Sequence, residues 1–158
     1  LSTLHTNDAP SAITRLLDLG VPAYLINSTL LGVMAQRLVR TLCPHCKKAV
    51  TPREEQRAAW RSLVAPWKSA EPTQIWQPVG CLECRMTGYT GRVGVYEILV
   101  NSPEIRRLIK PVTEIPKLRE QAFREGMRPL RISGALKVAQ GATSLEEVIK
   151  VAPPSDDS

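Results

Sequence analysis

The sequence is poor in aromatic side chains and has no long hydrophobic run. Phenylalanine, tyrosine and tryptophan make up 4% of its 158 residues, although 43% of them are hydrophobic. A core of this composition is mostly leucine, valine, isoleucine and alanine. No run of about 18 apolar residues occurs, so nothing in these residues spans a membrane as a helix.

A phosphate-binding loop is also absent. The pattern G-x-x-x-x-G-K-[ST], whose backbone N–H groups and lysine hold nucleotide phosphates, occurs nowhere in the 158 residues. Phosphoryl transfer requires a lysine, Mg²⁺ and an acidic residue to stabilise the charge on the transferred group. These residues alone therefore do not supply a complete site for that chemistry.

The first stretch, "LSTLHT", is typical of the end of a buried strand. Leu1 and Leu4 are apolar, and small polar residues lie between and after them. A chain rarely begins in the middle of a strand, and its first residue here is not methionine. We therefore expect the sequence to be a fragment whose N-terminal part is missing.

Basic residues are concentrated in one segment, 36–68, whose excess of eight basic over two acidic residues equals the whole net charge of +6. Such a segment suits nucleic acid, an anionic membrane surface, phosphate or an acidic partner protein. A solvated basic surface that only aids solubility is an equally good interpretation. The basic residues are Arg37, Arg40, Lys47, Lys48, Arg53, Arg57, Arg61 and Lys68.

All four cysteines lie in two C-x-x-C pairs, in "TLCPHCKKAV" and in "GCLECRMTGYTGR". Two such turns brought together form the four-sulfur tetrahedron that Zn²⁺ prefers. The two pairs are further apart than the usual ~15–20 residues, because a predicted helix is inserted between them. The predicted ligands are Cys43, Cys46, Cys81 and Cys84.

Other uses of the cysteines are weaker alternatives. Disulfides require an oxidising compartment, a redox pair needs only one C-x-x-C turn, and an iron–sulfur cluster also accepts four cysteines. Structural zinc is the favoured interpretation, because four sulfurs leave no open position for catalysis. His45, between the first two ligands, is then expected beside the site or exposed.

Local patterns predict a mixture of helices and strands. Helices are marked by caps such as Asp8 before Pro10, and by a capping box at Thr51 with Pro52 at the first helical position. A second capping box begins at Thr143 or at Ser144, because Glu146 and Glu147 follow three residues after each. In the helix predicted from about residue 129 the apolar residues are Leu130, Leu136 and Val138. Strands are marked by dense valine, isoleucine and tyrosine. The predicted helices cover about 9–20, 23–32, 51–66, 102–109, 113–126, 129–141 and 143–151, and the predicted strands about 34–42, 75–79 and 91–100.

Several stretches occur together in a specific order. They are "LSTLHTNDAPSAITRLLDLG", "AQRLVRTLCPHC", "GCLECRMTGYTGRVGVYEIL" and "EGMRPLRISGALKVAQGATSLEEVIKV". This series resembles the C-terminal part of the type II secretion and type IV pilus assembly ATPases, over nearly the whole chain from Leu1 to about Val151.

The resemblance implies an α/β fold. It corresponds to the C-terminal part of a RecA-like P-loop ATPase domain, with a tetracysteine zinc-binding insert and a small all-α C-terminal lobe. The implied segments are the end of the ATPase core at 1–42, the insert at 43–91, a strand with the helical lobe at 92–151, and a disordered tail at 152–158.

The resemblance also implies roles for particular residues. "STLHTNDA" corresponds to the family's histidine box, which places His5 near the γ-phosphate as a catalytic residue. Arg37 and Arg40, in "QRLVR", match positions suited to nucleotide phosphate or to an acidic group of a neighbouring subunit. From the residues alone, a strand-end histidine satisfied by backbone is the favoured interpretation of His5, and only the resemblance reverses that preference; each arginine is equally a solvated one.

The implied whole protein is a homo-hexameric motor in the bacterial cytoplasm, peripheral to the inner membrane. It uses ATP and Mg²⁺ to drive protein secretion or pilus assembly, and it docks on the cytoplasmic domain of a membrane platform protein. The 158 residues alone are expected to be inactive. The rival interpretation is a zinc-ribbon module for nucleic acid or protein; nucleic acid is not expected, because aromatic stacking platforms are scarce in the basic segment.

Overall fold

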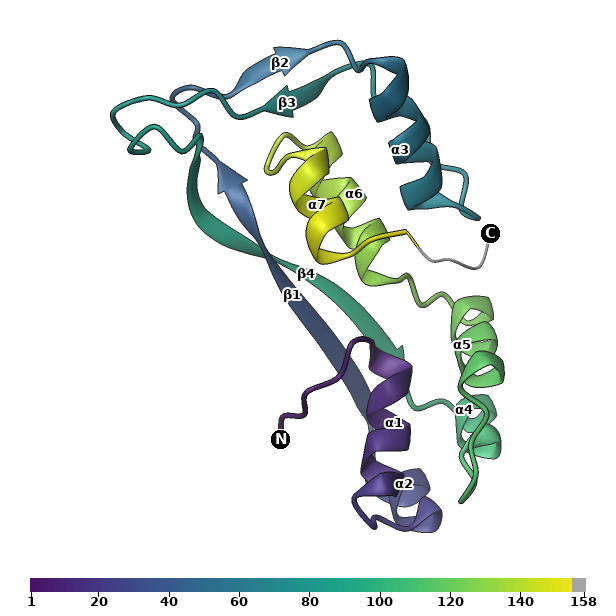
Figure 1. Cartoon of the computed structure of the whole chain (residues 1–158). Helices are drawn as coiled ribbons and strands as arrows, with labels where there is room; N and C mark the ends of the chain where they lie inside the picture. Colours follow the sequence, from purple (N-terminus) through teal and green to yellow (C-terminus); the bar gives the residue numbers. More distant parts are fainter. Residues whose placement is uncertain (155–158) are drawn as a thin grey trace. The chain divides into compact units, whose positions relative to one another are not determined.

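The computed structural model describes residues 1–154, which form helices and strands in mixed order (Figure 1). None of the helices in these residues is long and apolar enough to cross a membrane. Residues 155–158, which belong to the tail predicted to be disordered, lie outside the described residues. The elements are α1 (Ala9–Asp18), α2 (Ala23–Thr29), β1 (Gly32–Leu42), β2 (Lys48–Val50), α3 (Glu54–Val64), β3 (Ile75–Gln77), β4 (Tyr89–Val100), α4 (Pro103–Leu108), α5 (Ile115–Arg124), α6 (Leu130–Ala139) and α7 (Leu145–Val151).

The chain forms two compact units, and each combines two separate stretches of sequence. Unit 1 contains residues 1–36 and 96–129, whereas unit 2 contains residues 37–95 and the chain from Leu130 onward. The helices expected in one C-terminal lobe are therefore divided, with α4 and α5 in unit 1 and α6 and α7 in unit 2. The segment limits that the resemblance implies, at residues 42 and 91, do not coincide with these units and stay a prediction.

In unit 1, α1 contacts α2 and α5, and α5 contacts α4. The predicted start of α1 is confirmed, because the side chain of Asp8 accepts a hydrogen bond from the backbone N–H of Ser11. Its predicted end is confirmed as well, since Gly20 follows with φ +91°, a conformation that glycine adopts without steric cost. Ile13 and Leu118 are completely buried and represent the largely aliphatic core.

In unit 2, α6 contacts α3, α7 and β3. A methyl carbon of Val148 lies 2.4 Å from where a Cβ on Gly134 would be, so a glycine there allows α6 and α7 to approach closely. The short strands β2 and β3 pair antiparallel, with Ala49 opposite Trp76. Strand β2 was not among the predicted elements, because three residues carry no recognisable alternation.

The strand predicted at "LSTLHT" is wrong for the described residues. Residues 1–6 lie in no helix or strand, and both Leu1 and Leu4 are exposed. A strand forms only where a neighbouring strand shares its backbone hydrogen bonds. Within residues 1–154 the sheets consist only of β1 with β4 and β2 with β3.

Two finer predictions about helices are also wrong. Helix α3 begins at Glu54 rather than at Pro52, and its N-terminus is closed by the Gln56 side chain, which accepts from the backbone N–H of Arg53 at 3.0 Å. In α6, Leu136 was expected on the apolar face but is 57% exposed. The buried residues of α6 include Ala135 and Val138, one on each side of it in the sequence.

Candidate metal centre

Two tight turns in unit 2 carry the four cysteines. Cys43 follows β1 directly, and the N–H of Lys47 donates to its carbonyl oxygen at 3.0 Å, which closes the turn that holds Cys46. In the second turn the N–H of Met86 donates to the carbonyl oxygen of Cys81 at 2.8 Å. Each turn therefore presents two thiols from a backbone that is internally hydrogen-bonded.

The four sulfur atoms form one compact group, as the spacing predicts. All of them lie within 4.8 Å of one another. The Sγ–Sγ distances are 3.8 Å for Cys43–Cys81, 3.8 Å for Cys46–Cys84 and 3.7 Å for Cys81–Cys84. A regular tetrahedron with Zn–S bonds of ~2.3 Å has edges of ~3.8 Å, so the sulfurs already lie where a tetrahedral ion needs them.

The same distances exclude disulfides in this arrangement. A disulfide joins its sulfurs at ~2.0 Å, and all four cysteines have free thiols. Four thiol ligands suit Zn²⁺ or a tetrahedral iron centre. They would fill the coordination sphere of the ion, which indicates a structural and not a catalytic centre.

Two glycines make the second turn possible. Gly80 has φ +109° and Gly88 has φ +82°, both in the left-handed region. A Cβ on Gly80 would lie 2.9 Å from the carbonyl oxygen of Met86, and one on Gly88 would lie 2.4 Å from the Cβ of Pro78. Any other residue at either position would force the backbone around the turn to shift.

Backbone N–H groups also prepare the sulfurs for a cation. Burial opposes ionisation of Cys84, but N–H donation from Cys81 and Gly88, each at 3.2 Å, outweighs it and lowers the pKa of Cys84 to about 6. At Cys81, a backbone hydrogen bond with Cys84 works in the same direction, but burial and the neighbouring thiols raise its pKa to about 11. Metal ligands are thiolates, so Cys84 is ready to bind a cation at neutral pH, whereas Cys81 needs the cation in order to ionise.

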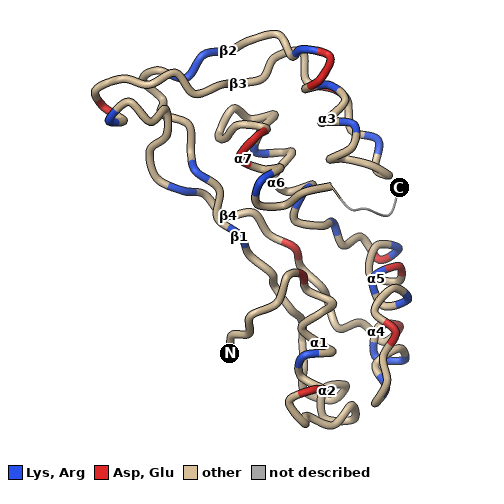
Figure 2. Tube along the Cα trace, in the orientation of Figure 1, with Lys and Arg blue, Asp and Glu red and all other residues tan. Residues whose placement is uncertain are grey.

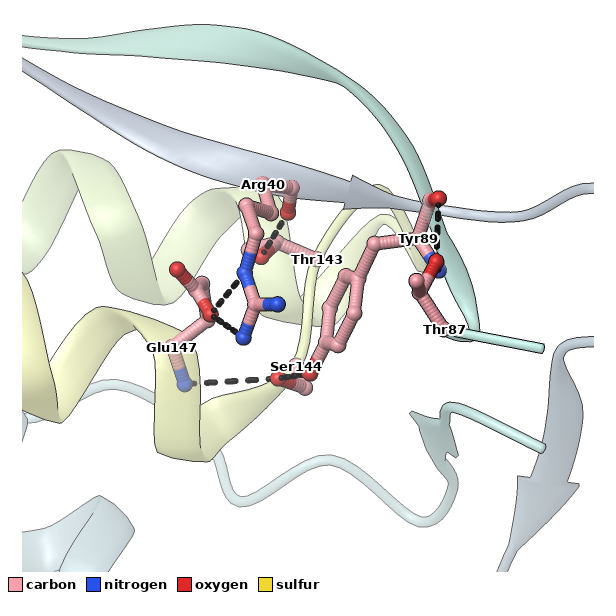
Figure 3. Close-up of polar contacts among 6 residues, drawn as sticks. All are labelled: Arg40, Thr87, Tyr89, Thr143, Ser144 and Glu147. Carbon is pink, nitrogen blue, oxygen red and sulfur yellow. Dashed lines mark hydrogen bonds and ion pairs between the residues drawn. The ribbon is translucent and has the colours of Figure 1, made fainter. Parts of the chain in front are cut away.

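A polar cluster in unit 2 links β1, the start of β4 and the start of α7 (Figure 3). The guanidinium of Arg40 on β1 contacts the carboxylate of Glu147 on α7 through two nitrogens, at 3.0 and 2.9 Å. The same guanidinium lies 4.1 Å from the ring centre of Tyr89. Glu147 is buried, and its pKa stays below the ordinary value because the hydrogen bond and charge of Arg40 outweigh the effect of burial.

The start of α7 belongs to this cluster. The oxygen of Ser144 caps the helix by accepting from the N–H of Glu147 at 3.3 Å, and it shares a 2.7 Å hydrogen bond with the hydroxyl of Tyr89. The hydroxyl of Thr143 donates to the backbone carbonyl of Arg40 at 2.7 Å. Of the two predicted registers for this cap, the structure therefore uses Ser144, while Thr143 fastens the turn to β1.

The remaining predicted site residues are divided between the two units. His5 is exposed in residues 1–6 of unit 1, whereas Arg37 and Arg40 lie on the part of β1 that belongs to unit 2. Their roles towards nucleotide or a neighbouring subunit stay predictions. His45 is exposed, as one of its two predicted placements requires.

Sequence reasoning missed the long-range contacts of two buried carboxylates. Glu147 was noted only as part of a cap, although it also binds Arg40. Glu97 is 4% exposed, and its carboxylate accepts from the N–H of Ala9 at 2.6 Å, at the start of α1. The signal for Glu97 was a single acid inside the apolar run "VYEILV". A glutamate buried in such a run is costly unless its carboxylate has a hydrogen-bond partner.

Part of the predicted basic segment, whose Lys and Arg positions are blue in Figure 2, makes contacts within the chain. Arg40 binds Glu147, Arg61 bridges Glu54 and Glu71, and Lys47 donates to the carbonyl of Gly141 at 2.9 Å. The other basic residues on β2 and around α3 are exposed. These are Lys48, Arg53, Arg57 and Lys68.

The fold and the site define a class of protein. This is an α/β chain of two units, each built from two stretches of sequence, and one unit carries four cysteines that could hold a metal ion. The model of the type II/IV secretion system protein family matches residues 1–150. The chain belongs to that family.

Several relatives support this assignment. Type IV pilus assembly ATPase TfpB of Acinetobacter baylyi is 50% identical over 153 residues, covering 97% of this chain and 26% of that protein. Type II secretion system protein HxcR of Pseudomonas aeruginosa is 45% identical over 96% of this chain and 28% of that protein. Type II secretion system ATPase E of Vibrio cholerae is 43% identical over 98% of this chain and 30% of that protein. The chain thus spans between a quarter and a third of the length of these relatives.

Proposed function

We propose that this chain is part of a hexameric ATPase that drives type II protein secretion or type IV pilus assembly in the bacterial cytoplasm, at the inner membrane. The family match over residues 1–150 is the observation that carries the proposal. Relatives named as ATPases of both systems support it. The identities of 50% and 43% do not separate secretion from pilus assembly, so the proposal includes both.

In this proposal the ATPase domain has a RecA-like core, and residues outside this chain complete its site for ATP and Mg²⁺. His5 acts near the γ-phosphate, where a neutral imidazole hydrogen-bonds phosphate or the attacking water. Arg37 and Arg40 contact nucleotide phosphate or an acidic group of a neighbouring subunit. For Arg40 such a role requires a competing anion, because its guanidinium is bound to Glu147 in the isolated chain.

The metal centre has a structural role in the proposed motor. Zn²⁺ held by the four thiols closes the long excursion of chain between β1 and β4, which carries the exposed basic residues around α3. That basic surface is a docking site for the acidic cytoplasmic domain of a membrane platform protein. The internal use of Arg40, Lys47 and Arg61 weakens the rival proposal of a nucleic-acid module, because fewer cations remain for phosphates.

Comparison of two histidine variants tests the proposal in the full-length protein. His5→Ala should lower kcat for Mg²⁺-dependent ATP hydrolysis by about 10²-fold, whereas the control His45→Ala should leave kcat unchanged. The 158 residues alone should show no turnover. A full-length protein without ATPase activity would contradict the proposal. If the chain also bound DNA in a salt-sensitive way, the rival module would be favoured.

A further inference from the structure

One face of the β1–β4 sheet in unit 1 is apolar and exposed. Along β4, Glu97 and Leu99 are 4% and 2% exposed, whereas Tyr96, Ile98 and Val100 are 42%, 56% and 64% exposed. Successive side chains of a strand point to opposite faces of its sheet. The three exposed residues therefore share one face, and the two buried residues share the other.

The start of β1 extends this exposed face. The N–H of Asn101 donates to the carbonyl oxygen of Leu31 at 3.0 Å, which brings the beginning of β1 beside the end of β4. Met34 is 62% exposed, whereas Ala35, on the other face of β1, is buried. Together these four residues form what we call the open apolar face: Met34, Tyr96, Ile98 and Val100.

The opposite face of the same strands is already covered. Helix α1 lies against it, with the N–H of Ala9 bound to the carboxylate of Glu97 at 2.6 Å. Ala9 and Ile13 of α1 are completely buried. The sheet is therefore finished on one side by this chain and unfinished on the other.

The composition of the strand indicates burial on both faces. "VGVYEILV" is a nearly continuous apolar run, which is typical of strands covered on both sides, whereas a half-solvated strand alternates with polar residues. A sheet of two strands is also marginal by itself. The open apolar face contains no charged residue, as is usual for permanent interfaces and unusual for solvated surface.

We propose that the open apolar face packs against the part of the secretion ATPase polypeptide that lies outside these 158 residues. The chain covers 26% of the relative from Acinetobacter baylyi, so most of such a polypeptide is available to cover the face. The inference rests on the proposed function only in requiring that longer polypeptide. A second copy of this chain is the competing occupant, and the experiment separates the two.

Oxidation of methionines by hydrogen peroxide, read by mass spectrometry, tests the proposal with an internal control. Met34 on the open apolar face and Met86 in the metal-binding turn are similarly exposed, at 62% and 66%, while Met127 is 6% exposed. In the 158-residue chain Met34 and Met86 should oxidise at similar rates. In the full-length protein the rate at Met34 should fall about 10-fold or more while Met86 stays reactive.

Two results would overturn the proposal. One is a Met34 that oxidises as fast as Met86 in the full-length protein. The other is protection of Met34 from oxidation in the 158-residue chain itself. If that protection increased with protein concentration and sedimentation gave a doubled mass, the face would be assigned to a second copy. Protection of Met34 in a full-length protein without ATPase activity would sustain this inference while refuting the proposed function.

A matched pair of substitutions gives an independent measurement. Ile98→Asn places an amide on the open apolar face, and Val112→Asn places one at a position that is 85% exposed and in no helix or strand. Both should leave the Tm of the 158-residue chain nearly unchanged. In the full-length protein Ile98→Asn should lower the Tm by about 5 °C or more and Val112→Asn should not; equal shifts for the two variants would contradict the proposal.

Discussion

Unit 2 and unit 1 are stabilised by different means. In unit 2, side-chain chemistry closes the structure, through four thiols, the Arg40–Glu147 pair, and a hydrogen bond from Arg131 to the carbonyl oxygen of Leu63. Unit 1 has a helical core, but it leaves four large apolar residues of one sheet face exposed.

The difference shows how each unit compensates for a small core. A metal bound only by the folded state adds its binding free energy to stability, so a metal held by the four thiols would stabilise the long excursion of chain in unit 2. Unit 1 contains no cysteine, so no metal-bound cross-link of this kind can form within it. Its exposed sheet face is instead the kind of surface that another part of a protein covers.

Loss of the metal centre should produce the largest difference between the units. Cys81→Ser removes one metal ligand, and chelation removes the metal itself. Structural Zn²⁺ binds zinc-finger peptides with a free energy of about 10–16 kcal/mol. Amide hydrogen exchange, followed by mass spectrometry, should accelerate strongly around residues 43–50 and 75–88 in unit 2. Exchange in α1 and α5 of unit 1 should change little.

Metal analysis of the purified protein supplies the control. His45 lies between two of the cysteines in sequence but is exposed. The variant His45→Ser should therefore retain one equivalent of zinc and the amide hydrogen exchange of the wild type. Purified wild-type protein without zinc or iron would refute the metal centre. Unchanged exchange in metal-depleted Cys81→Ser protein would show that the turns do not need the ion.

Breaking the polar cluster should have an intermediate effect, confined to unit 2. Arg40→Ala leaves the buried carboxylate of Glu147 without its cation, at a cost of about 2 kcal/mol once the half-exposure of Arg40 is allowed for. Arg61→Ala is the matched control, because Arg61 pairs only with exposed carboxylates. Urea unfolding of the two variants measures the difference, and equal stabilities would remove the special role of Arg40.

The pH dependence of stability identifies the charge responsible. Arg40 holds the pKa of Glu147 below its ordinary value of 4.5, so the carboxylate contributes stability that is complete above pH 4.5 and lost as the pH falls through its folded pKa. Glu147→Gln should weaken this acid-dependent loss. A wild-type and a Gln variant with identical acid profiles would exclude Glu147 as the group involved.

Removing the cap of α1 should have the smallest effect and should act on unit 1. Asp8→Ala loses the hydrogen bond from the N–H of Ser11 and the 2.7 Å contact with Arg119, at a cost of about 1 kcal/mol. Asp8→Asn keeps the cap without the charge and should recover most of that stability. Exchange rates in α1 measure the effect; a faster exchange in α7 of unit 2 instead would contradict the division into units.

Short-range signals predicted most of the elements. The caps at Asp8, Ser102 and Ser144, and the left-handed glycines after α1, α5 and α6, act within one or two turns of helix. The cysteine spacing predicted that the four thiols would meet, because two C-x-x-C turns offer few other solutions. These features follow from neighbouring residues.

Long-range features escaped the same reasoning. The strand predicted at Leu1–Thr6 is absent, since strand formation depends on a partner strand. The pairing of Arg40 with Glu147 joins residues far apart in the sequence, and no local pattern marks it. The predicted apolar position Leu136 is exposed because its neighbours on α6, and not its own hydrophobicity, decide which side of the helix is buried.

The sequence by itself determined most of the helices, the meeting of the four cysteines and the family, because each depends on residue type at fixed local spacing. Only the tertiary structure decided that α4 and α5 join unit 1 while α6 and α7 join unit 2, and that one side of the strand "VGVYEILV" is covered and the other open. Burial is a property of what lies opposite a side chain, and that neighbour is chosen by the folded chain as a whole.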